Sequence, residues 1–156
     1  MILRLGSRQR KTGIWNTMNN FFEEIQHSGE RYAIILDTLD SPEGLNFVTQ
    51  NPDYIQAGIW NYKKGTELAT HYHNYYERVS HRTSEVAYVV EGKVECTVFT
   101  EEGELIWKGV LNKGQLIIQL QGAHKYRILE DAIVVETKNG PYFGPEVDRT
   151  RIEGND

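Results

Sequence analysis

Short apolar runs recur at near-regular intervals over most of the chain, from residue 32 onward. Their β-branched and aromatic residues predict strands at 32–36, 54–62, 86–90, 94–99, 105–111, 116–120 and 132–137. Turn-forming clusters lie between many of these runs: 41–44, Glu91-Gly92, Glu102-Gly103, Lys113-Gly114, Gln121-Gly122 and Glu130-Asp131. Many short strands at such spacing indicate a sandwich or a barrel. The pattern therefore predicts an all-β fold.

The first thirty residues follow a different pattern. Apolar side chains recur there at helical spacing: Trp15, Met18, Phe22 and Ile25. Asn16 or Thr17 would cap the start of such a helix, and Gly29 would end it. We therefore expect one short amphipathic helix before the strands.

The aromatic residues of this segment suggest core packing or a subunit contact. Trp15, Phe21 and Phe22 form a stripe that exceeds what a small barrel needs for covering. Large apolar patches usually mark interfaces, so the stripe predicts a homodimer.

No internal repeat, low-complexity stretch or linker interrupts the sequence. We therefore expect a single domain over 1–156, with an N-terminal extension at 1–30 and the core of the barrel at 54–138.

Charge and cysteine content narrow the class of protein. Seventeen basic against twenty-two acidic residues give a formal net charge of -5, which argues against a general binder of nucleic acid or of acidic membranes. No run approaches the ~18 apolar residues of a membrane span, and residues 1–30 lack a signal-like apolar run. Cys96 is the only cysteine and alternates with valines, so we expect a buried structural thiol. The expected location is the cytoplasm.

Histidines and one glutamate form a candidate metal site. His71 and His73 are two residues apart, so both would point to the same side of an extended segment. Glu85 opens the next strong strand, where an antiparallel neighbour could bring its carboxylate beside the histidines. His124 follows Gly122, just past another predicted strand.

These residues resemble the two motifs of the cupin superfamily. In the first motif a glycine precedes a His-x-His, as Gly65 precedes His71, and a glutamate stands seven residues before a second glycine, as Glu85 does before Gly92. Gly114, Gly122 and His124 resemble the second motif. The resemblance covers roughly 65–137. It implies a double-stranded β-helix, or jelly-roll barrel, with His71, His73, Glu85 and His124 as ligands of one divalent transition metal ion.

The chain departs from the family pattern in ways that leave a rival alignment open. Eleven residues separate His73 from Glu85, where the usual motif has three or four. His81 has the normal spacing to Glu85, but Val79 would then replace the first histidine. The position of Gly65 favours His71 and His73 as the ligands. His81 would then be a general base, a group supporting the ligands, or a surface residue.

The resemblance also suggests a function. Three imidazoles and one carboxylate suit Fe, Mn, Ni, Co or Zn. Residues 135–149 are similar to the end of cupin-type mannose-6-phosphate isomerases, and the whole chain resembles small cupins of surface-polysaccharide sugar biosynthesis. The implied activity is isomerisation or epimerisation of a sugar phosphate or nucleotide sugar, with Glu77 or His81 moving the proton. An iron-dependent dioxygenase and a non-enzymatic module that binds a sugar or metabolite remain alternatives.

Overall fold

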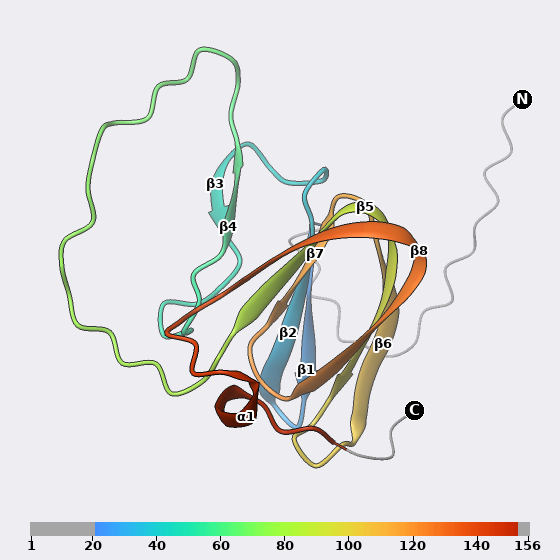
Figure 1. Cartoon of the computed structure of the whole chain (residues 1–156). Coiled ribbons are helices and arrows are strands. Elements are labelled where there is room, and N and C mark those ends of the chain that lie inside the picture. Colours follow the sequence, from blue (N-terminus) through green and yellow to red (C-terminus); the bar gives the residue numbers. More distant parts are fainter. Residues whose placement is uncertain (1–20, 153–156) are drawn as a thin grey trace, which may run out of the picture.

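In a computed structural model of the protein, the described residues are 21–152, and their regular secondary structure is almost entirely β (Figure 1). Eight strands and one short helix follow one another in this range. They are β1 (Phe22–His27), β2 (Glu30–Asp37), β3 (Gly44–Phe47), β4 (Gly58–Asn61), β5 (Glu85–Phe99), β6 (Leu105–Asn112), β7 (Gln115–Gln119), β8 (Ala123–Lys138) and α1 (Pro145–Asp148). The predicted all-β fold is confirmed at this level.

One antiparallel sheet dominates the structure and curls into a half-barrel. Its strands lie in the order β1-β2-β7-β5-β6, and β8 pairs with β5. The strands β3 and β4 form a separate two-stranded sheet. Figure 1 shows β5 and β8 bending together as they cross the sheet, which gives the half-barrel a concave inner face.

The bend in β5 is centred on Gly92, which has a φ of 82°. The register of β5 against β8 shifts between Val89 and Glu91 and again up to Val94, so bulges accompany the bend. A Cβ on Gly92 would lie 2.1 Å from the backbone oxygen of Asp131. Glycine is therefore required here both by the backbone angle and by the close approach of β8.

The core lies on both faces of the strands β2, β7 and β5. Successive residues of β7 illustrate this, because Ile117 and Ile118 point to opposite faces and both are fully buried. The inner cluster includes Ile117, Cys96 and Val98, and the outer one includes Ile118 and Ile34. Apolar residues on both faces explain why 116–120 reads as an unbroken hydrophobic run.

The predicted N-terminal helix is wrong where the structure describes it. Its second half is strand β1, which pairs with β2 through a two-residue turn at Ser28 and Gly29. Both turn residues have positive φ, 51° and 83°, which is typical of a tight β-hairpin. Gly29 therefore turns a hairpin instead of ending a helix. Trp15 and Met18 lie outside the described residues.

Two predicted turns are also wrong. The strands expected at 86–90 and 94–99 are one strand, because β5 continues through Glu91-Gly92 as a bend. In the same way, β8 runs through Glu130-Asp131 and begins at Ala123, well before the predicted start at 132. The turns at Glu102-Gly103, Lys113-Gly114 and Gln121-Gly122 lie outside the strands, as predicted.

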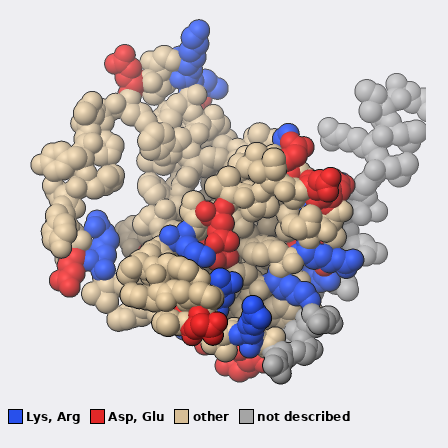
Figure 2. Space-filling view, viewed as in Figure 1, with Lys and Arg blue, Asp and Glu red and all other residues tan. Residues whose placement is uncertain are grey.

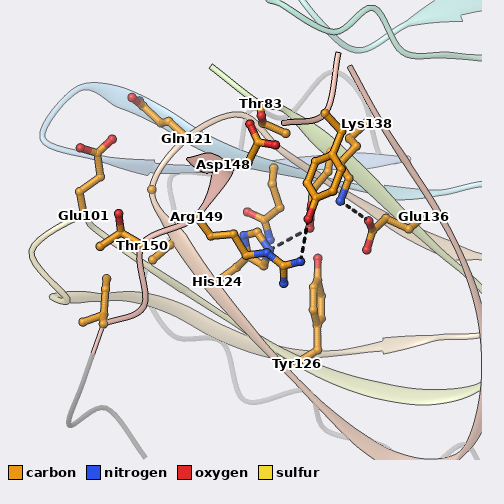
Figure 3. A pocket seen from close by; sticks show the side chains of 16 residues that line it. Thr83, Glu101, Gln121, His124, Tyr126, Glu136, Lys138, Asp148, Arg149 and Thr150 are labelled. Atoms are coloured by element: carbon orange, nitrogen blue, oxygen red, sulfur yellow. Dashed lines mark hydrogen bonds and ion pairs between the residues drawn. The ribbon is translucent and has the colours of Figure 1, made fainter. Parts of the chain in front are cut away.

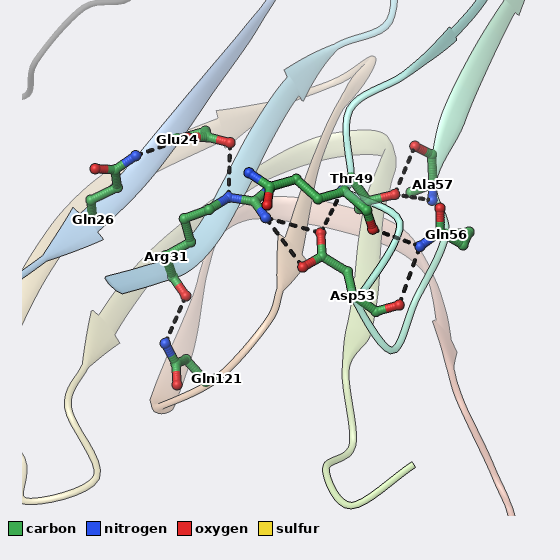
Figure 4. A network of polar contacts seen from close by, with 9 residues as sticks. Glu24, Gln26, Arg31, Thr49, Asp53, Gln56, Ala57 and Gln121 are labelled. Carbon is green, nitrogen blue, oxygen red and sulfur yellow. Dashed lines mark hydrogen bonds and ion pairs between the residues drawn. The ribbon is translucent and has the colours of Figure 1, made fainter. Parts of the chain in front are cut away.

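Arg31 on β2 attaches the segment after β3 to the main sheet (Figure 4). Its Nη1 donates to both carboxylate oxygens of Asp53, at 3.2 and 3.0 Å, and its Nε donates to Glu24 Oε1 at 2.9 Å. Asp53 Oδ2 in turn accepts the backbone N–H of Gln50 at 2.6 Å. This network fixes the loop between β3 and β4 against β2.

A long loop connects β4 to β5. Residues 62–83 contain no helix or strand, and all of them are exposed. Figure 1 shows this loop extending far from the sheet before it returns to β5. Ser84, at its end, is buried, and its N–H donates to Asn139 Oδ1 at 2.6 Å.

Among the described residues, no helix is long and apolar enough to cross a membrane. Acidic and basic side chains alternate over the face shown in Figure 2, without a large patch of one sign. Phe21 is buried in the outer cluster and Phe22 packs against it. These two aromatic residues therefore do not form the exposed stripe from which the homodimer was predicted, and the homodimer stays a prediction.

Candidate functional site

A cavity of about 820 Å³ opens on the concave face of the half-barrel. Strands β5, β7 and β8 supply its floor, and residues 142–152 cover one side of it. Its polar lining includes Glu85, Gln119, His124, Tyr126, Glu136, Lys138, Tyr142 and Arg149 (Figure 3). Its volume lies within the ~300–1,000 Å³ of typical small-molecule sites.

Glu85 and His124 meet in this cavity. Glu85 Oε1 lies 2.8 Å from His124 Nε2, and the carboxylate side chain is only 13% exposed. The hydrogen bond from His124 lowers the pKa of Glu85 despite partial burial, and the charges of Lys138 and Arg149 act in the same direction. Glu85 is therefore a carboxylate at neutral pH.

Gln119 and Tyr126 line the cavity with polar groups whose oxygen atoms are buried. Neither Gln119 Oε1 nor Tyr126 Oη has a hydrogen-bond partner among the described residues, although both atoms are buried. Gln119 Nε2 makes only a weak contact with Cys96 Sγ, at 3.6 Å. Burial raises the pKa of Tyr126 well above its usual value, so its hydroxyl remains protonated.

Cys96 lies under this floor as a buried thiol, as predicted. Burial raises its pKa to about 12, so it is not a nucleophile at neutral pH.

Charged and aromatic groups line the rim of the cavity. Lys138 Nζ lies 2.8 Å from Glu136 Oε1 and 5.4 Å from the centre of the Tyr142 ring. Arg149 Nη2 donates to Tyr142 Oη at 3.3 Å. Figure 3 shows Arg149 reaching from the C-terminal segment toward Tyr142 and across His124.

The structure brings two of the four predicted metal ligands together and leaves the other two apart. Glu85 and His124 form the pair described above. His71 and His73 lie on the exposed loop, where their ring centres are 5.3 Å apart and His71 Nδ1 lies 3.0 Å from Ala69 O. Within residues 21–152, no group of three or more His, Cys, Asp or Glu side chains is placed to hold a metal ion.

The donor set therefore fits a metal only in part. Glu85 and His124 offer one oxygen and one nitrogen at a shared point, which suits a transition metal. The arrangement of the loop does not add His71 or His73 to them. The role of the four residues as metal ligands stays a prediction.

The two predicted catalytic residues do not line the cavity. Glu77 and His81 are exposed on the loop. The His81 ring lies 6.4 Å from the ring of Tyr54, edge to face. Their proposed role in proton transfer is untested by this arrangement.

Sequence reasoning overlooked Gln119 and Tyr126. A signal for each was present. Tyr126 stands two residues after His124, so on a strand it points to the same side. Gln119 is a polar residue in the apolar run of β7, two residues from the buried Ile117. The relationship between His124 and Tyr126 was missed because the strand that contains both was predicted to start only at residue 132.

A scan against protein-family models finds no match, and searches of the curated proteins and of the solved structures find none either. The cupin resemblance thus rests on the sequence motifs.

Proposed function

We propose that this protein is a cupin-like isomerase or epimerase that acts on a sugar phosphate or nucleotide sugar. The observation that supports this most directly is the Glu85–His124 pair, placed beside the protonated hydroxyl of Tyr126 in one polar cavity. A base and a hydroxyl donor side by side suit proton transfer next to a carbonyl group.

The pair determines which nitrogen of His124 acts as the base. Glu85 is a carboxylate, so His124 Nε2 carries the proton of their hydrogen bond, and in neutral His124 the lone pair is on Nδ1. A carboxylate that orients a histidine in this way stabilises the imidazolium when the histidine takes a proton.

The reaction then needs two further steps. His124 Nδ1 removes a proton from the carbon beside a substrate carbonyl, and the electron pair of that C–H bond forms an enediolate. The Tyr126 hydroxyl donates a hydrogen bond to the developing oxyanion. Return of the proton to the former carbonyl carbon, with transfer of the adjacent hydroxyl proton to the enediolate oxygen, gives an isomer, and return to the opposite face of the original carbon gives an epimer. If Glu85 and His124 instead hold a metal, as the motif resemblance implies, the metal would supply Lewis-acid polarisation of the carbonyl and Glu77 or His81 would move the proton in place of His124.

The lining of the cavity supports a sugar derivative as the ligand. Its amide, phenol, carboxylate and ammonium groups offer both donors and acceptors to hydroxyl groups. The exposed ring of Tyr142 at the rim provides an apolar face of the kind on which a sugar ring can pack. The proposal includes the jelly-roll barrel, cytoplasmic location and homodimer expected from the sequence.

Deuterium incorporation tests the proposal without knowledge of the product. The protein is incubated in D₂O with a panel of aldose phosphates, ketose phosphates and nucleotide sugars, and exchange at carbon is measured by NMR. We expect exchange into at least one compound, lowered about 10²–10⁴-fold in His124→Ala. His27→Ala is the matched control, because His27 also faces a carboxylate, Glu104 at 3.6 Å, but outside the cavity.

Absence of exchange with every compound, or equal loss in both variants, would contradict the proposal. Oxygen uptake by iron-loaded protein without exchange would favour the dioxygenase alternative. Ligand binding without either reaction would favour a non-enzymatic binding module.

A further inference from the structure

The cavity has two chemically different ends. Its floor contains the uncharged polar groups Gln119 and Tyr126, and its rim contains the cations Lys138 and Arg149 beside the carboxylates of Glu101, Glu136 and Asp148. A ligand that matches both ends has an uncharged part and an anionic part.

At the floor, two buried groups lack partners. Gln119 is 3% exposed, and its Oε1 is an acceptor without a donor among the described residues. Tyr126 Oη lies near enough to Gln119 for the amide to act on the pKa of the phenol, but the two groups lack the geometry of a full hydrogen bond. A buried polar group without a partner destabilises the folded state, so native structures usually satisfy such groups. One ligand hydroxyl could donate to Gln119 Oε1 and accept from Tyr126 Oη.

At the rim, Arg149 is the better placed of the two cations. Lys138 is already paired with Glu136. The guanidinium of Arg149 uses Nη2 for Tyr142 Oη, and the carboxylates of Glu136 and Glu85 act on it electrostatically without forming an ion pair with it. The remaining N–H groups of a guanidinium form a planar fork that suits phosphate.

We propose that the cavity binds its ligand in one orientation, with an uncharged hydroxyl or carbonyl end against Gln119 and Tyr126 and a phosphoryl group against Arg149. This inference rests on the proposed function only in the choice of the ligand class. It adds the direction of binding and assigns Arg149 as the phosphate-binding residue. In this orientation the uncharged end lies beside the Glu85–His124 pair.

Inorganic phosphate is the probe for the rim. Thermal unfolding is followed in sodium phosphate and in sodium chloride of equal ionic strength. At about ten times the Kd of phosphate, we expect the Tm of the wild type to rise by about 3–6 °C over chloride. Arg149→Gln should lose at least about half of this rise. Arg151→Gln is the matched control, because Arg151 is on the same segment but does not line the cavity, and it should keep the full rise.

An absent phosphate effect in the wild type, or an equal loss in the two arginine variants, would overturn the assignment of Arg149. The readout is binding, so it is independent of the exchange assay. A protein that binds phosphate through Arg149 but exchanges no deuterium would refute the isomerase and keep this inference.

Stability is the readout for the floor. If Gln119 and Tyr126 keep free hydrogen-bonding groups for a ligand, removing those groups should not destabilise the ligand-free protein. We expect the Tm of Gln119→Leu and Tyr126→Phe to stay the same or rise. Thr49→Val is the control, because Thr49 Oγ1 is buried and accepts the N–H of Ala57 at 2.9 Å. It should lower the Tm by about 2–4 °C.

If Gln119→Leu and Tyr126→Phe lower the Tm as much as Thr49→Val does, the two side chains hold the fold together and the floor assignment is wrong.

Discussion

Glu85 Oε1 and His124 Nε2 are 2.8 Å apart, although they stand at opposite ends of the pairing between β5 and β8. Glu85 pairs with Lys138, and His124 pairs with Val98. A straight strand from Glu85 to Val98 would span about 43 Å at ~3.3 Å per residue. The contact therefore exists because β5 and β8 fold over together near Gly92.

Gly92→Ala should weaken both the fold and the cavity. The new Cβ would lie 2.1 Å from Asp131 O and 2.8 Å from Ala132 Cα, and both neighbours are backbone atoms that cannot rotate away. We expect the free energy of unfolding to fall by more than about 2 kcal/mol, as measured by chemical denaturation.

Gly65→Ala separates the effect of crowding from that of the backbone angle. Gly65 also has a positive φ, 90°, but nothing lies within 4 Å of its Cβ position. Its cost should be about 1 kcal/mol. Equal costs for the two variants would mean that the close approach of β8 to Gly92 does not matter.

Glu23→Gln should stabilise the protein at neutral pH. Burial raises the pKa of Glu23 above 4.5, so the folded state pays for ionisation of this carboxyl. That penalty is present above the raised pKa and vanishes as the pH falls below 4.5, where the carboxyl is protonated in both states. The gain from Glu23→Gln in denaturation experiments should therefore shrink between pH 7 and pH 4. A gain that grew on acidification would contradict this sign, and Glu30→Gln, at an exposed position of β2, is the control.

Asp53→Asn should destabilise the protein through the Arg31 network. The side chains of Arg31 and Asp53 are 15% and 16% exposed, so the largely buried guanidinium would keep Glu24 but lose the carboxylate that faces its Nη1. We expect a loss of about 1–3 kcal/mol in the free energy of unfolding. Glu43→Gln removes an exposed ion pair with Lys63 and should change it by less than about 0.5 kcal/mol. Similar effects of both variants would rule out the network as a structural anchor.

Metal content distinguishes the two alignments of the histidines. The motif resemblance predicts about one transition metal ion per chain in protein purified without added metal. His71→Ala and His124→Ala should lose most of it, whereas His81→Ala should keep it. Full metal in His71→Ala with an empty site in His81→Ala would support the rival alignment. If metal binds through His71, residues 62–83 must take a different path from the extended one.

Cys96 should resist alkylation in the folded protein. The thiol is fully buried and its pKa is about 12, so the reactive thiolate is scarce at pH 8. Reaction with iodoacetamide should be at least about 1,000-fold slower than in guanidinium chloride, because it requires opening of the core. A rate within tenfold of the unfolded protein would contradict burial under the cavity floor.

The strands were predictable where the pattern of apolar residues fitted a strand and not a helix. The runs at 105–111 and 116–120 are strands β6 and β7 because apolar and β-branched residues fill most of each run, between turns that contain Gly103, Gly114 and Gly122. Phe22 and Ile25 suggested a helix, but three residues apart on strand β1 they point to opposite faces, and both faces are covered: Phe22 packs against the outer cluster and Ile25 lies in the inner one. Only pairing with β2 decides between the two, and pairing is a long-range property.

The sequence singled out Glu85 and His124 as metal ligands, a role that stays a prediction, and it placed Glu85 correctly at the start of a strand but His124 after one, whereas His124 lies at the start of β8. Their contact was not predictable, since it depends on a bend at Gly92 that looked like an ordinary turn. Gln119 and Arg149 come together with them only through the curl of the sheet and the path of the C-terminal segment. Neither feature leaves a local pattern in the sequence.

The exposed loop at 62–83 lies between two segments of the chain whose strands pair with each other in the main sheet. It includes Lys63, Lys64, Arg78 and Arg82, all accessible to trypsin. A cut there would leave β1 to β4 on one fragment and β5 to β8 on the other, while β2 stays hydrogen-bonded to β7 from Ala33–Gln119 to Asp37–Gln115. The two fragments should therefore remain associated after cleavage. They could also be produced separately and reassembled around the cavity.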